Sequence, residues 1–318
     1  PPAQQYLADM YQQTRRNPAV IANSKFFALK TVQERDIAAY GMKRLVWRHP
    51  DQALRVWQKF VNDPYFSAGQ RLDVQRQFAI ALASKGDERA ALWFDDLPAE
   101  FIDSTLAHWH VSHALAELDW PKVQKIIENL PQEVSTDSAW RYWLARAYEQ
   151  QGQADKAKPL FETLALQRHF YGFMAAAKLG LKPSLAHRPV PISDEQYQAF
   201  KKSDSIARMY EWQAIGRPNA AKRELTFLQK YGTPQQQLSA AKLAYDNGWY
   251  DRAIFALADA GYWDDVEMRF PMVYNKEIQK HSKAAQVDPA WAMAITRRES
   301  TFIPTAKSPV GAQGLMQI

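Results

Sequence analysis

The residues best suited to chemistry lie in the last stretch of the sequence, RRESTFIPTAKSPVGAQGLMQI, residues 297–318. It carries one carboxylate, Glu299, and no Asp or Glu follows. Neutral hydrogen-bonding side chains come after it, Ser308, Gln313 and Gln317, with the adaptable apolar side chain of Met316. A lone acid among neutral donors suits an uncharged, hydroxyl-rich substrate such as a sugar. Phosphate would call for Arg, Lys or a phosphate-binding loop, and a metal ion would call for several ligands.

A helix must position this glutamate. The segment VDPAWAMAITRRESTF, residues 287–302, has Asp288 as a good N-cap and Pro289 at the first helical position. Steps of three and four residues place four side chains on one predicted face: Ala292, Ile295, Glu299 and Phe302. An apolar face and a helix C-terminus both disfavour a charged carboxylate, so we expect Glu299 to keep its proton near neutral pH and to act as a general acid. The alternative is a Glu at a frayed helix end, solvated or paired with arginine.

The residues after this helix predict a loop beside the acid. Pro304 and Pro309 prevent a continuing helix. Gly311 and Gly314 allow positive φ angles and a close approach of the backbone. We therefore expect a non-helical wall of neutral polar groups next to Glu299.

The order of these residues, E-S-x-F-x-P-x-A-x-S-P-x-G-A-x-G-L-M-Q from Glu299 to Gln317, resembles the signature of the soluble lytic murein transglycosylases of bacterial cell walls. Two further segments are similar to parts of this family, HFYGFMAAAKLG at 169–180 and RFPMVY at 269–274. The likeness covers the whole chain. It implies an α-superhelix, a helical linker domain and the start of a lysozyme-like catalytic domain, in a periplasmic protein.

The resemblance also implies a mechanism. The single catalytic glutamate of the family matches Glu299, which would protonate the glycosidic oxygen between N-acetylmuramic acid (MurNAc) and N-acetylglucosamine (GlcNAc). As a base it would then deprotonate the muramyl C6 hydroxyl, giving a 1,6-anhydromuramyl end. Ser308 matches a position that helps to place the substrate, and Gly314, Met316 and Gln317 match the motif lining the glycan groove. Most glycosidases need a second carboxylate, whereas here the substrate hydroxyl is the nucleophile.

Members of this family continue past the GLMQ motif with helices that complete the groove, and they extend further at the N-terminus. We therefore expect residues 271–318 to be the first part of a truncated catalytic domain, which leaves open whether the chain as given is active. Prolines and a Ser-Asp pair in LKPSLAHRPVPISDEQ mark a boundary at 181–196. The expected division is a superhelical repeat domain at 1–182, a Pro-containing linker at 183–203, a helical linker domain at 204–270 and the catalytic part at 271–318.

Composition limits the other classes. The 318 residues include no cysteine, which excludes disulfides, thiolate catalysis and Cys-ligated metals. The formal charge of +6 is modest, and Lys and Arg are scattered rather than clustered as in a nucleic-acid groove. No window has the apolar length of a membrane span. The chain opens PPAQQYLADM, without a signal peptide, so a periplasmic location follows from the resemblance alone.

The chain before the site has the periodicity of an all-α protein. Apolar residues recur every three or four positions, and the window 139–165 predicts two helices with a turn at Gly152. A small residue five positions after a glycine recurs in four pairs: Gly86/Ala91, Gly152/Ala157, Gly216/Ala221 and Gly248/Ala253. We interpret them as a degenerate α-superhelix similar to tetratricopeptide repeats, in which each helix pair buries its apolar face against its neighbours.

Aromatic and histidine residues in this repeat region have two interpretations. The Trp residues from Trp47 to Trp143 are expected to be packing anchors, with ligand stacking as the alternative. His108, His110 and His113 have a spacing that could bind a metal, but without flanking carboxylates we expect a structural role. No cofactor is indicated.

Two other functions remain open. The repeats fit a non-catalytic scaffold that binds a protein partner equally well, but such a scaffold has no need for the terminal motif. An ordinary hydrolysing lysozyme would release reducing rather than anhydro ends. The expected partners are peptidoglycan glycan strands and cell-wall synthesis proteins, and we expect a monomer.

Overall fold

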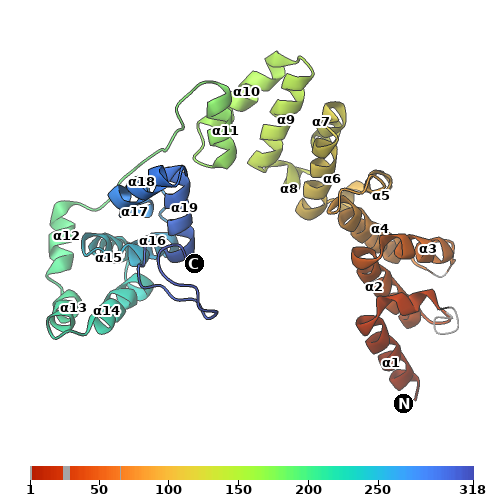
Figure 1. Cartoon of the computed structure of the whole chain (residues 1–318), viewed down its shortest axis with the longest axis horizontal. Coiled ribbons are helices and arrows are strands. Elements are labelled where there is room, and N and C mark those ends of the chain that lie inside the picture. Colours follow the sequence, from red (N-terminus) through yellow and green to blue (C-terminus); the bar gives the residue numbers. More distant parts are fainter. Residues whose placement is uncertain (1, 24–28, 65) are drawn as a thin grey trace. The chain divides into compact units, whose positions relative to one another are not determined.

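The computed structural model describes residues 2–23, 29–64 and 66–318 (Figure 1). The regular elements of the described chain are all helices, and a single isolated antiparallel bridge between Lys307 and Gln313 is its only extended pairing. This confirms the all-α prediction. The chain divides into two compact units, Pro1–Ser184 and Leu185–Ile318.

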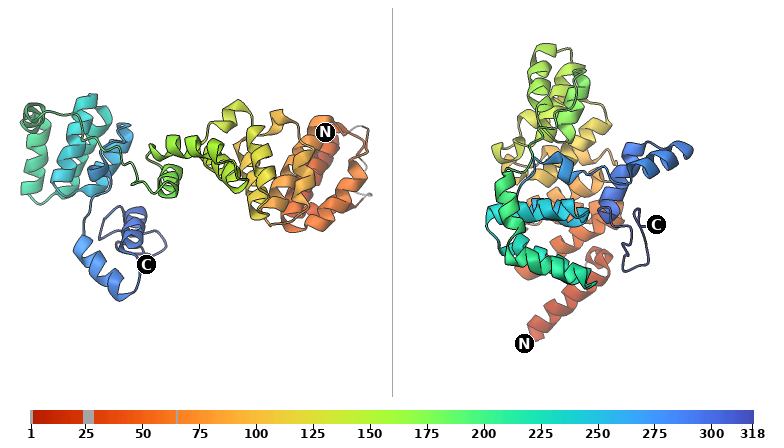
Figure 2. Two further views of the ribbon diagram at one scale, coloured as in Figure 1. Left: turned by 90° about the horizontal axis from the view of Figure 1, so that it is seen from above. Right: turned by 90° about the vertical axis from the view of Figure 1, so that its left-hand side faces the viewer.

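Unit 1 is a succession of helices in which packing joins elements that are adjacent in the chain or one element apart, such as α2 with α3 and α4 (Figures 1 and 2). The helices are α1 (Pro2–Arg16), η1 (Pro18–Ala22), α2 (Val32–Arg48), α3 (Pro50–Phe60), α4 (Ala68–Ala83), α5 (Ala90–Asp95), η2 (Ala99–Phe101), α6 (Ser104–Ala116), α7 (Trp120–Glu128), α8 (Gln132–Ser135), α9 (Ser138–Gln150), α10 (Ala154–Ala165) and α11 (Phe170–Lys178). Their buried side chains form three successive clusters rather than one core. This is the nearest-neighbour burial expected of helical repeats.

Glycines with positive φ end the first helix of each predicted pair. At Gly152, where φ is +74°, the Gln153 N–H donates to Tyr148 O at 2.8 Å and the Gly152 N–H donates to Glu149 O at 3.0 Å. These two bonds satisfy carbonyls at the helix end that would otherwise lack partners. The same pair of bonds follows at Gly216 and Gly248.

The small residue five positions later is buried in three of the four pairs: Ala157, Ala221 and Ala253. In each case the second helix begins two residues after the glycine. The fourth pair corrects the prediction. After Gly86 the helix α5 begins four residues later, so that the fully buried residue is Ala90 rather than Ala91.

Most of the tryptophans in unit 1 are packing residues, as predicted, but Trp47 is not. Trp57 and Trp140 are buried, and the Trp57 ring meets that of Trp93 edge-on at 5.6 Å. Trp47 is 41% exposed. It follows the buried Val46 in α2, and one step of about 100° on the helix turns its side chain away from the core.

The histidines of α6 have structural partners. The His110 ring stacks on Phe94 with centroids 4.3 Å apart and planes within 5°. The Nε2 atom of His113 lies 3.3 Å from Asp87 O. Burial lowers the pKa of His110 to about 4, so the ring is neutral at physiological pH. No group of three potential ligands for a metal ion occurs within the described ranges.

Unit 2 has a single core cluster, which runs from Tyr197 to Met268. Its helices are α12 (Asp194–Lys201), α13 (Asp204–Ala214), α14 (Pro218–Tyr231), α15 (Pro234–Asp246), α16 (Tyr250–Asp259), α17 (Val266–Arg269), α18 (Asn275–Ala284) and α19 (Pro289–Ser300). Helix α12 lies in the stretch expected to be linker. A capping box starts it, since Ser193 Oγ accepts from the Gln196 N–H and the Gln196 side chain accepts from the Ser193 N–H.

The proline-containing segment before α12 is tied to the end of the helical core of unit 2. The Arg188 N–H donates to Asp264 O at 2.9 Å, and the Val190 N–H donates to the Asp265 carboxylate at 3.0 Å. His187 Nδ1 accepts from the Val266 N–H at 3.1 Å. These contacts fix the start of α17, the helix after which the chain continues to α18 and α19.

The pKa of His110 predicts how unit 1 responds to acid. The pKa of His110 in the folded state lies below the ordinary value of 6.5. As the pH falls, His110 is therefore protonated in the unfolded chain before it is protonated in the folded one. The contribution of neutral His110 to the free energy of unfolding is complete above about pH 6.5. It is lost as the pH falls toward 4, by up to about 3 kcal/mol. We expect His110→Leu to remove this part of the acid sensitivity, measured as urea midpoints at pH 7 and pH 4.5.

The matched control is His108→Leu on the exposed side of α6, which should keep the wild-type acid sensitivity. Equal acid sensitivity in wild type and His110→Leu would contradict the assignment.

Candidate functional site

Helix α19 begins as its sequence predicts. The Asp288 side chain accepts a hydrogen bond from the Ala290 N–H at 2.8 Å, and Pro289 takes the first turn. The helix ends at Ser300, where Thr301 adopts a left-handed conformation with φ of +50°. Phe302 also has positive φ, so it lies outside the helix and does not extend the face of α19. Its side chain is buried.

The environment of Glu299 differs from the prediction. The buried residues of α19 are Ala292, Thr296 and Ser300, at steps of four. Thr296 Oγ1 donates to Ala292 O and Ser300 Oγ donates to Thr296 O, each at 3.0 Å, and these bonds let two hydroxyl residues occupy the buried stripe. Glu299 stands about 100° away on the helix and is exposed to solvent. Among the residues that the structure describes, none supplies the apolar surroundings predicted for its carboxyl group.

The loop after α19 is held by its own hydrogen bonds, and Ser308 is central to them. The Ser308 N–H donates to Ala312 O at 2.9 Å, while its hydroxyl oxygen accepts from the Ala312 N–H at 3.0 Å. Gly311, with φ of +100°, makes the turn between them. The Ser308 hydroxyl hydrogen is still available for a ligand, because Oγ acts as an acceptor in this contact.

Gln317 closes the other side of the loop. Its side-chain amide Nε2 donates to Ala306 O at 3.1 Å and to Gly314 O at 2.9 Å. The Gly314 N–H in turn donates to Ala306 O at 2.9 Å. Met316 is partly buried beside them. The loop thus brings together Ser308, Gly314 and Gln317, while no hydrogen bond or ion pair joins Glu299 to it within the described residues.

Chemically, this region offers one carboxyl group on a helix end, followed by a pre-formed loop whose hydrogen-bonding side chains are uncharged. Within residues 299–318 the other charged side chain is Lys307, which is exposed. Such a site can transfer a proton and hydrogen-bond a neutral polar ligand, but it does not offer the set of oxygen or nitrogen ligands that a metal ion requires.

Arg297 is a residue of this region whose role the sequence did not predict. Its Nε donates to Arg269 O at 3.0 Å, and its guanidinium lies 4.3 Å from the centre of the Phe270 ring. Burial lowers the pKa of Arg297 from its ordinary value. The contact fixes the helix that carries Glu299 to the segment RFPMVY. The partners are 28 residues apart in sequence, so periodicity could not have found them.

No helix in the described parts of the chain combines the length and the apolar character needed to cross a bilayer.

Comparisons with known families match two parts of unit 2. Residues 199–266 match the soluble lytic murein transglycosylase L domain, and residues 276–318 match the transglycosylase SLT domain. The first match runs from the last turn of α12 through α16, and the second covers α18, α19 and the loop described above.

Individual relatives agree with these matches. The chain is 32% identical over 232 residues to the soluble lytic murein transglycosylase of Escherichia coli K12, which is 73% of this chain and 36% of that protein. A solved structure of the lytic transglycosylase Slt of Pseudomonas aeruginosa, an inactive variant with one glutamate replaced by glutamine, has a TM-score of 0.88 at 30% identity. It is matched over 98% of this chain and 51% of its own length.

The 70 kDa soluble lytic transglycosylase of Escherichia coli has a TM-score of 0.84 at 27% identity, over 100% of this chain and 51% of its own. The chain thus spans about half of the solved relatives and about a third of the curated one.

The contacts of Arg297 predict that it orients α19. Arg297→Met keeps the aliphatic stem but removes the charged donor and the contact with the Phe270 ring. We expect a loss of about 1–2 kcal/mol in local stability. The amide hydrogens of α19 should then exchange at least roughly ten times faster than in the wild type.

Arg298→Met is the control, because Arg298 is exposed and follows directly on the same helix. If both variants left exchange in α19 unchanged, Arg297 would not hold this helix.

Proposed function

Because the chain belongs to the soluble lytic transglycosylases, we propose that it forms part of an enzyme that cleaves the β-1,4 bond between MurNAc and GlcNAc without water. Glu299 is the single acid and base. The proposal rests on the motif from Glu299 to Gln317, in which a lone carboxyl group precedes a loop held by hydrogen bonds of Ser308 and Gln317.

The proposed reaction has two proton transfers. The Glu299 carboxyl group gives its proton to the glycosidic oxygen, and the bond from that oxygen to muramyl C1 breaks. The resulting carboxylate takes the proton of the muramyl C6 hydroxyl, whose oxygen forms a new bond to C1. The N-acetyl group can stabilise C1 between the two transfers. Glu299 ends protonated again, and no water is consumed.

Because Glu299 is exposed, the substrate itself has to shield its carboxyl group from water. A glycan strand laid over the end of α19 and the following loop would exclude water from the carboxyl group and from the reacting sugar atoms. Ser308, Gly314, Met316 and Gln317 are proposed to line that strand, with the Ser308 hydroxyl hydrogen as a donor to the sugar.

The glutamate-to-glutamine change in the inactive Pseudomonas aeruginosa variant supports the importance of one glutamate in that relative. A scaffold without catalytic function remains the alternative, but it gives no reason for the terminal motif. We further propose the four-part division at 1–182, 183–203, 204–270 and 271–318. A periplasmic location, action as a monomer on glycan strands and contact with cell-wall synthesis proteins are also proposals.

We expect the full-length protein to release 1,6-anhydromuropeptides from purified sacculi, and Glu299→Gln to lower the rate at least about a hundredfold. The substitution keeps the side-chain shape and removes the proton donor. The readout is mass spectrometry of the digest together with circular dichroism, which should be unchanged.

Glu277→Gln on α18 is the matched control, since Glu277 is also exposed and lies in the same matched domain. Products one water heavier would contradict the non-hydrolytic reaction, and an active Glu299→Gln variant would contradict the role of the acid.

A further inference from the structure

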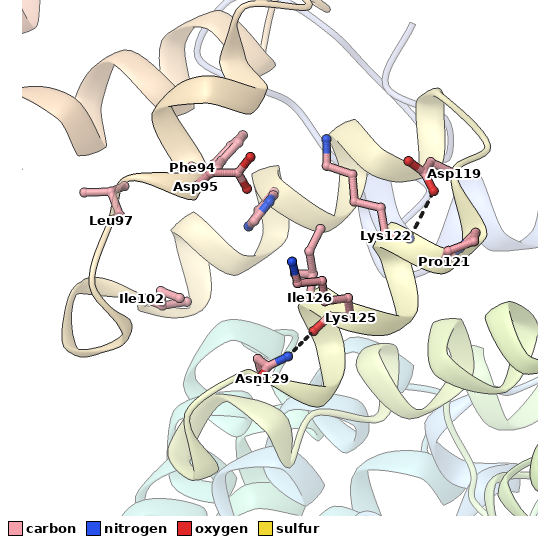
Figure 3. A pocket seen from close by; sticks show the side chains of 11 residues that line it. Phe94, Asp95, Leu97, Ile102, Asp119, Pro121, Lys122, Lys125, Ile126 and Asn129 are labelled. Carbon is pink, nitrogen blue, oxygen red and sulfur yellow. Dashed lines mark hydrogen bonds between the residues drawn. The ribbon is translucent and has the colours of Figure 1, made fainter.

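Unit 1 contains a cavity of about 610 Å³ that the proposed reaction does not use (Figure 3). It lies between the end of α5 with its following loop and the helices α6 and α7. Its size is within the range of small-ligand sites in proteins.

The cavity has an apolar lining. Phe94 and Leu97 are buried side chains on one side, and Ile102 and Ile126 are partly buried on the other sides. Small aliphatic groups of a ligand would therefore lose contact with water on binding, which is favourable.

Charged groups of opposite sign lie around this lining. Asp95 ends α5, whereas Lys122 and Lys125 come from α7, where their spacing of three residues puts them on one face. Figure 3 shows Asp95 across the cavity from the two lysines. Lys122 Nζ lies 3.6 Å from Glu117, and no ion pair of Asp95 or Lys125 is found in the part of the chain that the structure describes.

Two further groups do not alter this balance. His110 lines the cavity but is neutral at physiological pH, because burial lowers its pKa to about 4. The Asp119 carboxylate accepts from the Lys122 N–H at 3.0 Å and caps α7. The cavity thus presents an anionic side, a cationic side and an apolar lining between them.

From this arrangement we infer that the cavity binds a short peptide that carries a free carboxylate and a free amine. The carboxylate is placed between Lys122 and Lys125, the ammonium faces Asp95, and aliphatic side chains rest on Leu97 and Ile126. A polyanion such as nucleic acid fits less well, because Asp95 would repel its phosphates.

The source of this ligand rests on the proposed function. The peptides of peptidoglycan combine alanine methyl groups, free carboxylates and the amine of a diamino acid, so they match all three parts of the cavity. We therefore assign the cavity to the stem peptide of the wall polymer. Unit 1 would hold the peptide while unit 2 acts on the glycan.

The test is titration calorimetry of the protein at low salt with a sugar-free synthetic stem peptide, L-Ala-γ-D-Glu-meso-diaminopimelyl-D-Ala. We expect measurable binding, weakened about five- to tenfold by Lys125→Met and by Asp95→Asn. Both side chains are exposed, so neither change removes buried packing. The same peptide with its carboxylates amidated should bind at least fivefold more weakly.

Lys158→Met is the matched control, because Lys158 is an exposed lysine of unit 1 outside the cavity, and it should leave the dissociation constant unchanged. Equal affinity of wild type, Lys125→Met and Asp95→Asn would overturn the assignment, as would equal affinity for the amidated peptide. The peptide has no glycosidic bond. Absent binding with intact glycan cleavage would therefore reject only this site, and binding without cleavage would reject only the proposed function.

Discussion

The fold depends on one repeated constraint: a short helix can bury its apolar face only if the chain reverses at once and the next helix covers it. Glycines in the left-handed region make this possible, because the N–H groups at and after the glycine satisfy the last carbonyls of the helix. A small residue such as Ala157 or Ala253 then lets the second helix approach closely. The consequence in unit 1 is a series of local clusters in place of a single core.

Unit 2 adds contacts between distant parts of the sequence to this local scheme. Val190 is bonded to Asp265 just before α17 and His187 to Val266, its first residue, while Arg297 is bonded to its last residue, Arg269. Between them these contacts determine how α19 leaves the helical core. The orientation of Glu299 therefore depends in part on the Arg269 carbonyl and the Phe270 ring, which hold Arg297 two residues away on the same helix.

The candidate site combines an exposed carboxyl group with a loop that is held by its own hydrogen bonds. Ser308 and Gln317 use part of their hydrogen-bonding capacity on the loop itself, which fixes its shape before any ligand arrives. Glu299 has no such restraint and faces water. In the proposed reaction, the bound glycan excludes water from Glu299, and its muramyl C6 hydroxyl is the nucleophile. The cavity beside Lys125 would add affinity for the peptide part of the polymer without contributing to the chemistry.

Features that depend on neighbours along the chain could be predicted from the order of the amino acids. These are the all-helical class, the turns at Gly152, Gly216 and Gly248, the start of α19 at Asp288 and Pro289, and the motif from Glu299 to Gln317. Tertiary structure decided which helix face is buried. The stripe of Ala292, Thr296 and Ser300 replaced the predicted apolar face, because hydroxyls bonded to their own helix can be buried. It also decided the role of Arg297, since only packing brings residues 28 positions apart into contact.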